Sequence, residues 1–277
     1  MLTETFHSII TAARQVFTNW RAMLLLATVY ASLLAALYFF VAVREANVAQ
    51  VILTFALAIA TPLLFFLLQS MVASQADEVN GGSLLRRSLG SFWKLILISL
   101  PLIALAVLIA YLLAKAQNHF GASLNNPATD VPHPLVAEAQ RAAARPISWK
   151  VASLSAVRYL AFGLVLPLAA IHLWLATVHE GLGSAIRKTG THLAHAFAPR
   201  SVLIYIAGFL IFGVAPYFLL FKTTQTRHAW LELGLLVTRL VVVFVLTLFG
   251  WVITVRALAQ FSTTPLRDLQ DRANEAT

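Results

Sequence analysis

Histidines are the clearest candidates for chemistry in this chain, because half of the eight fall in one short stretch. These four are His172, His179, His192 and His195, and Glu180 lies among them. Imidazole is a common metal ligand, and His179-Glu180 begins the H-E-x-x-H pattern of zinc proteases. Gly183 stands where the second histidine belongs, and His192 and His195 continue a polar face begun by Lys188. We therefore predict no metal, no haem and no other cofactor.

Signatures of enzymes are missing elsewhere in the sequence. The chain has no cysteine, no G-x-x-x-x-G-K-[ST] phosphate loop and no G-x-S-x-G elbow. No Asp or Glu lies in the middle of an apolar run, whereas ion-coupled transporters usually keep a carboxylate inside the membrane. The sequence favours a protein that is not an enzyme. An interfacial lipid enzyme remains an alternative, with His179, Glu180, His192 or His195 as its only candidate groups.

Basic residues provide the clearest binding signal. The formal net charge is +9, but the 20 Lys and Arg are scattered over all the loops, and no nucleic-acid module is recognisable. Anionic lipid headgroups suit such juxtamembrane cations, and we expect no nucleic-acid partner. The predicted headgroup contacts are Arg86, Arg87, Lys94, Arg187 and Lys188.

Six long apolar runs must position these residues. Apolar residues make up 60% of the 277 residues and charged residues 11%, and about 20 apolar helical residues cross a bilayer. The predicted fold is all-α: a polytopic bundle that forms one membrane domain over 1–277, with a periplasmic loop over 115–150 and a tail over 256–277. The predicted spans are 23–43, 48–72, 95–114, 159–178, 201–221 and 235–255.

Three amphipathic segments precede alternate spans, which indicates three interfacial helices. The first runs from Phe6 to Trp20; the second and third begin at Gly82-Ser83 and Gly183-Ser184, where each serine is a candidate N-cap. Arg14 and Arg21 precede the first span, which favours cytoplasmic N- and C-termini. Within the long loop, Leu135–Arg145 reads as a short helix.

Prolines occur within four spans, at Pro62, Pro101, Pro167 and Pro216. Each removes a backbone hydrogen bond, and we expect Thr61 and Ser99 to bond the freed groups beside the first two. The intramembrane His172 is expected to make an interhelical hydrogen bond. Arg158 and Arg239 lie near the outer ends of their helices, so we expect their flexible side chains to reach the interface.

Two segments carry a resemblance to a known family. Gly82–Arg87 and Gly183–Lys188 share the pattern G-S-[LA]-[LI]-[RK]-[RK] and alternate with the spans. This arrangement resembles the six-span bacterial membrane domains fused to glycerophosphodiester phosphodiesterases, and related stand-alone proteins of unknown function. The catalytic barrel of those fusions is absent, so no phosphodiesterase residue is carried over. The resemblance implies a bacterial inner-membrane protein in a supporting role.

These observations predict a non-enzymatic scaffold or accessory subunit. Its expected partners are membrane lipids and another membrane protein or a second copy of itself. The alternative is a permease-like transporter, in which the proline-containing second to fifth spans line a path and His172 lies on it.

Overall fold

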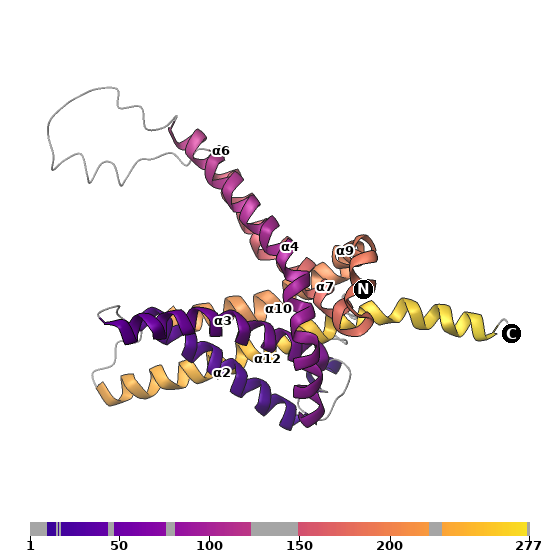
Figure 1. Ribbon diagram of the computed structural model, residues 1–277, viewed down its shortest axis with the longest axis horizontal. Helices are drawn as coiled ribbons and strands as arrows, with labels where there is room; N and C mark the ends of the chain where they lie inside the picture. The colour runs from indigo at the N-terminus through magenta and orange to yellow at the C-terminus, as the bar shows by residue number, and fades with distance from the viewer. Residues whose placement is uncertain are drawn as a thin grey trace. The chain divides into compact units, whose positions relative to one another are not determined.

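Helices form all the regular structure in the described part of the chain (Figure 1). The computed structural model describes residues 10–14, 16, 18–43, 47–75, 81–122, 149–221 and 229–275. Six helical stretches among them are long and apolar enough to cross a membrane, which confirms the predicted all-α, multi-pass architecture. The six are Trp20–Ala42, Val48–Gln75, Gly82–Asn118, Ala152–Glu180, Pro199–Phe221 and Trp230–Gln260.

Contacts divide the chain into two compact units. The first consists of Met1–Ser99 and Leu168–Thr277, and the second of Leu100–Pro167. Both divisions fall beside a proline, since Leu100 precedes Pro101 and the second unit ends on Pro167 itself.

Helical hairpins build the first unit. Helix α2 (Trp20–Ala42) packs on α3 (Val48–Gln75), and α3 also contacts α12 (Ala229–Glu275) (Figure 1). Three successive segments lie along α12, namely α10 (Pro199–Phe209), the π-helix η2 (Leu210–Val214) and α11 (Ala215–Phe221). A hydrogen bond of 3.0 Å between the hydroxyls of Tyr30 and Thr247 links α2 to α12.

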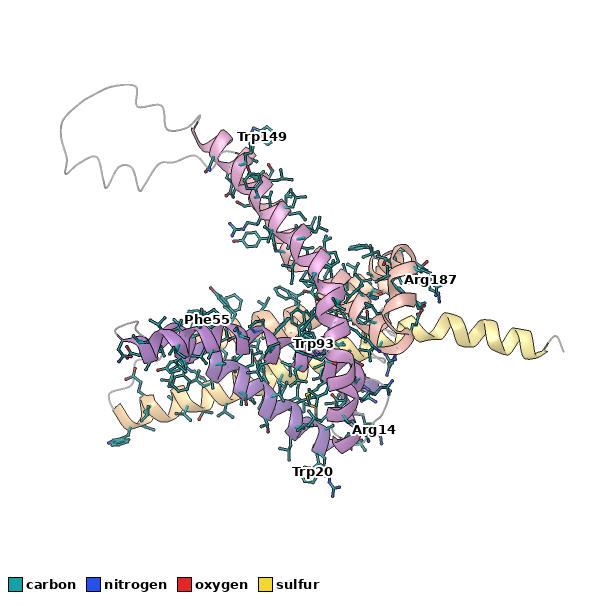
Figure 2. The ribbon with its side chains drawn as sticks, viewed as in Figure 1. Arg14, Trp20, Phe55, Trp93, Trp149 and Arg187 are labelled. Atoms are coloured by element: carbon teal, nitrogen blue, oxygen red, sulfur yellow. The ribbon has the colours of Figure 1, made fainter. Side chains whose placement is uncertain are left out.

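Helix α7 (Leu166–Glu180) is the most enclosed element of this unit, because every residue from Ile171 to Thr177 is buried. Large apolar side chains point outward elsewhere: Phe55 of α3 is 69% exposed (Figure 2). Apolar side chains that face outward along whole helices are what a lipid environment requires. The interior of the unit is therefore packed with side chains, and its apolar outer surface suits contact with lipid hydrocarbon.

Glycines bring α10 and η2 close to α12. A Cβ atom on Gly208 would meet the side chain of Thr254, and one on Gly250 would meet Phe212. These pairs run in opposite directions along the two helices, as an antiparallel hairpin requires. Small residues allow such close approach in membranes, where packing replaces the hydrophobic effect as the force between helices.

The four prolines are accommodated in two ways. Pro62 lies inside α3 and Pro101 inside α4 (Gly81–Ala122), and both helices are continuous. Pro167 and Pro216 instead follow the π-helices η1 (Ala161–Val165) and η2 by two residues. In both cases the residue before the proline donates its N–H five residues back, from Leu166 to Ala161 and from Ala215 to Leu210. Proline cannot donate an N–H and clashes with the carbonyl four residues earlier, so a widened turn relieves both problems.

The expectation that Thr61 and Ser99 bond the carbonyls freed by proline was wrong in its detail. The freed carbonyls are those of Ala58 and Leu97, four residues before each proline. Thr61 Oγ1 instead donates to Leu57 O (2.8 Å) and Ser99 Oγ to Leu95 O (2.7 Å). A hydroxyl in a helix reaches the carbonyl four residues before its own position, and this geometry determines the partner.

The second unit contains the latter half of α4, then α6 (Trp149–Leu160) and η1. Helix α4 continues to Ala122 and α6 begins at Trp149, so both ends of the predicted 115–150 loop are helical. The predicted helix over Leu135–Arg145 lies outside the described residues. At the other end of the chain, α12 continues to Glu275, so the predicted 256–277 tail is helical over most of its length.

The predicted interfacial segments differ in form. Residues 10–14, 16 and 18 are helical, and α2 begins after Asn19; Phe6, Ile9 and Phe17 lie outside the described residues. The second segment is not a separate helix, because α4 runs unbroken through it into the span. The third forms α8 (Leu182–Arg187) and α9 (Thr189–Ala196), which are separate from α10. Helices α4 and α8 begin before Ser83 and Ser184, so neither serine is an N-cap.

We predict that Gly250→Ala destabilises the α10–α12 hairpin by about 1–3 kcal/mol, because the added methyl group forces Phe212 to move. Thermal unfolding of the purified chain in detergent measures this change. The matched control is Gly234→Ala on the same helix, where a Cβ meets no atom within 4 Å. Equal melting temperatures for both variants would contradict the close packing.

Candidate functional site

The first half of α4 separates a buried face from a basic one. Leu84, Ser88, Ser91 and Leu95 are buried at intervals of three or four residues, the spacing of one helix face. Between them lie exposed residues that include Arg86, Arg87, Trp93 and Lys94; Trp93 is 65% exposed and is labelled in Figure 2. A surface with arginine, lysine and tryptophan next to an apolar span is typical of the membrane–water boundary.

A hydrogen bond joins the buried face of α4 to α3. Ser70 Oγ of α3 donates to Ser88 O (2.8 Å), and both serines are fully buried. A serine beside a backbone carbonyl lets two helices approach closely and satisfies its hydroxyl without water. The exposed face of α4 is therefore presented on an anchored helix.

The second basic segment begins with a sharp turn after α7. Gly181 adopts φ +84°, a left-handed conformation that glycine accepts without strain, and α8 starts at the next residue. Three side chains then gather on the carboxylate of Glu180. Ser184 Oγ donates to it at 2.9 Å, Lys188 Nζ lies 3.2 Å away, and His192 Nε2 lies 3.7 Å away.

This cluster weakens the expectation that Lys188 contacts a lipid headgroup. Its ammonium group is paired with Glu180, although its side chain remains 58% exposed. Arg187 is exposed and makes no ion pair within the described part of the chain, and the same holds for Arg86 and Lys94. Of the five predicted headgroup residues, Lys188 is therefore paired with a carboxylate, whereas Arg86, Lys94 and Arg187 are exposed and without an ion pair among the described residues.

Chemically, the Glu180 cluster ties α7 to α8 and α9. The carboxylate of Glu180 accepts hydrogen bonds from Ser184 and from Lys188, which lies eight residues further along the chain. It brings Glu180 and His192 together, two of the residues predicted for an interfacial enzyme. Among the described residues, no group of three or more His, Cys, Asp or Glu side chains is placed to hold a metal ion.

His172 is buried in α7 at 5% exposure. Its Nδ1 lies 3.0 Å from Leu168 O, one turn earlier in the same helix. The expected interhelical hydrogen bond is therefore replaced by one within α7. The interhelical bond comes from Trp174 instead, whose Nε1–H donates to Ser99 Oγ (2.8 Å) and whose ring meets Phe65 edge-on with centroids 6.2 Å apart.

Sequence reasoning missed a group of polar residues near the end of α3. Gln69 accepts a hydrogen bond from Trp251 Nε1 of α12 (2.9 Å), and Gln75 Nε2 contacts Met23 Sδ of α2 (3.6 Å). Ser74 and Gln75 are almost fully buried. The signal was available, since buried polar residues in an apolar span are costly and therefore indicate specific contacts. The contacts of Gln69 and Gln75 with other helices cannot be read from the sequence.

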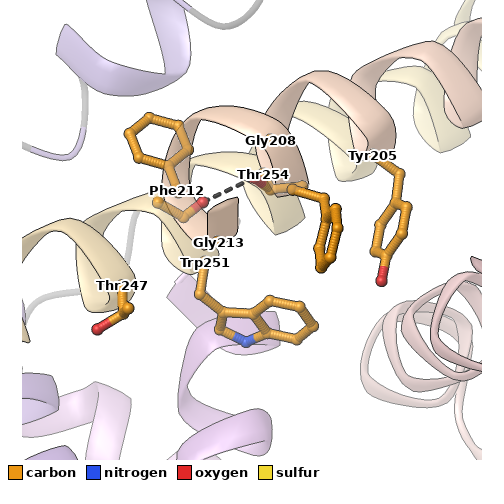
Figure 3. A pocket seen from close by; sticks show the side chains of 9 residues that line it. Tyr205, Gly208, Phe212, Gly213, Thr247, Trp251 and Thr254 are labelled. Atoms are coloured by element: carbon orange, nitrogen blue, oxygen red, sulfur yellow. Dashed lines mark hydrogen bonds between the residues drawn. The ribbon is translucent and has the colours of Figure 1, made fainter. Parts of the chain in front are cut away.

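A small cavity of about 100 Å³ lies between α12 and the α10–η2 segment (Figure 3). Its polar side chains are already engaged: Thr254 donates to Gly250 O (2.7 Å), Thr247 pairs with Tyr30, and Trp251 donates to Gln69. Tyr205 and Phe209, stacked with ring centroids 6.5 Å apart, form an aromatic wall. The cavity is lined largely by apolar groups and glycines, so it has no arrangement for acid–base chemistry.

No family model, no curated protein and no solved structure matches the chain. The resemblance of Gly82–Arg87 and Gly183–Lys188 to the phosphodiesterase-fused membrane domains therefore stays a prediction. The six long apolar helices identify a multi-pass membrane protein.

We predict that Glu180→Gln loosens α8 and α9 without unfolding the protein, because an exposed ion pair contributes less than about 1 kcal/mol. Hydrogen–deuterium exchange in residues 182–196 should accelerate, while exchange in α7 stays unchanged. The control is Glu232→Gln, at the start of α12. Unchanged exchange in both segments would show that Lys188 and Ser184 do not hold the turn.

Proposed function

We propose that this chain is a non-enzymatic accessory or scaffold protein of a bacterial inner membrane, with both termini in the cytoplasm. It binds anionic lipid headgroups through Arg86, Arg87, Lys94 and Arg187 and supports another membrane protein or a second copy of itself. The observation that carries the proposal is the exposed basic and aromatic face of α4, continuous with a membrane-spanning helix. Each cation at such a surface contributes about 1 kcal/mol.

We predict that replacing Arg86, Arg87, Lys94 and Arg187 with glutamine lowers the enrichment of phosphatidylglycerol around the protein by about tenfold or more. The chain is extracted in polymer nanodiscs, and mass spectrometry identifies the lipids and proteins that accompany it. The matched control replaces the three arginines with lysine and Lys94 with arginine, which keeps every charge. Bulk lipid composition around the unmodified chain, without any protein partner, would contradict the proposal.

A permease-like transporter is the second candidate, and the two π-helices favour it. Widened turns before Pro167 and Pro216 interrupt the regular α-helical hydrogen bonding of two spans. Such π-turns are frequent at functional sites. His172 is buried, and in the sequence it lies between these two turns.

We predict no saturable flux through the protein in proteoliposomes, as expected of an accessory role. Uptake and efflux of mixed solute pools are compared with empty liposomes, and His172→Ala serves as the second arm. A saturable flux that His172→Ala abolishes would overturn the accessory role and establish the transporter.

A further inference from the structure

The second unit contains a cavity of about 510 Å³ between α4 and the α6–η1 segment. It lies outside the surfaces assigned above. The residues that line it are Ala110, Leu113, Ala114, Gln117, Arg158, Tyr159, Phe162 and Gly163.

Polar and apolar residues occupy opposite ends of this lining. On α4, Ala110 precedes Gln117 by seven residues, which is two turns or about 10 Å along the axis. On the other side, Arg158 and Tyr159 precede Gly163 by about one turn. Helix α6 begins at Trp149, whose exposed ring suits the membrane boundary. Arg158, Tyr159 and Gln117 therefore lie at the boundary end, and Ala110, Phe162 and Gly163 lie toward the bilayer centre.

Charge selects the occupant. The described residues of this unit, 100–122 and 149–167, include Lys115, Lys150 and Arg158 but no Asp or Glu. Arg158 makes no ion pair or hydrogen bond within the described part of the chain. An arginine fork matches a phosphate group, and small residues leave room for a hydrocarbon chain beside the helix.

We propose that this cavity binds one anionic phospholipid, with its phosphate on Arg158 and an acyl chain along Ala110, Phe162 and Gly163. Lys94 and Lys115 bracket residues 95–114, a largely apolar run of 20 residues that spans about 30 Å. The site therefore lies at the membrane boundary at the Lys115 end of this run. It goes beyond the proposed function and does not depend on it.

A photoactivatable phosphatidylglycerol with a diazirine in its acyl chain tests the site on the full chain in nanodiscs. Peptide mass spectrometry should find adducts within residues 110–117 and 158–163. Arg158→Gln should reduce them about tenfold, and Arg158→Lys about twofold or less. Gly163→Leu should also remove them, because Gly163 lines the cavity, a Cβ there meets no atom within 4 Å, and the larger side chain would occupy the cavity.

Gly234→Leu is the matched control, since that position is equally open and lies outside the cavity; its adducts should equal those of the unmodified chain. Equal labelling by a phosphatidylcholine analogue, or labelling that survives Arg158→Gln, would overturn the proposal. Inorganic phosphate is then added at about 10 mM, a concentration on the order of saturation for a free-phosphate site. Loss of labelling under this condition would assign the site to free phosphate instead. Adducts within residues 86–94 report separately on the proposed function, so the two can fail independently.

Discussion

The structure depends first on the requirement that every backbone hydrogen bond be made within the chain, because lipid supplies no donors or acceptors. Prolines violate this requirement in four spans. Two of them, Pro62 and Pro101, are tolerated inside continuous helices. The other two follow a π-turn in the same register, each with a phenylalanine–glycine pair inside the turn. A recurring local solution at Pro167 and Pro216 indicates a structural rule that the chain uses twice, independent of how its two units are arranged.

The same absence of water determines what holds the helices together. Lipid is as apolar as leucine, so helices gain little from burying leucine against one another and associate through close packing and polar contacts. Gly208 and Gly250 provide the close packing between α10 and α12. Trp174 with Ser99 and Trp251 with Gln69 provide the polar contacts, each an indole N–H that joins helices far apart in sequence. An indole suits this role because it combines a large apolar surface with one donor that must find an acceptor when buried.

Composition was enough to predict the helical class and all six spans, because length and apolarity alone determine which segments can cross a bilayer. Local chemistry was less well predicted. Ser83 and Ser184 were expected as N-caps, but an earlier helix start left both inside their helices. His172 was assigned an interhelical bond that Trp174 makes instead. The two errors have different causes. The serines failed because the helices start earlier, whereas for His172 and Trp174 the tertiary placement of the side chains decides which of them bonds a neighbouring helix.

The candidate site shows why counting charges is a poor guide to lipid binding. Lys188 and Arg187 are neighbours in sequence and look equivalent, yet the structure pairs Lys188 with Glu180 and leaves Arg187 facing outward. An ammonium group that already has a carboxylate partner gains less from a lipid phosphate, since binding the lipid weakens an existing attraction. For the proposed lipid binding, we therefore expect α4 and Arg187 to contribute more of the attraction than Lys188 does. Within the described residues, the Glu180–Lys188 ion pair at 3.2 Å joins the end of α7 to the end of α8.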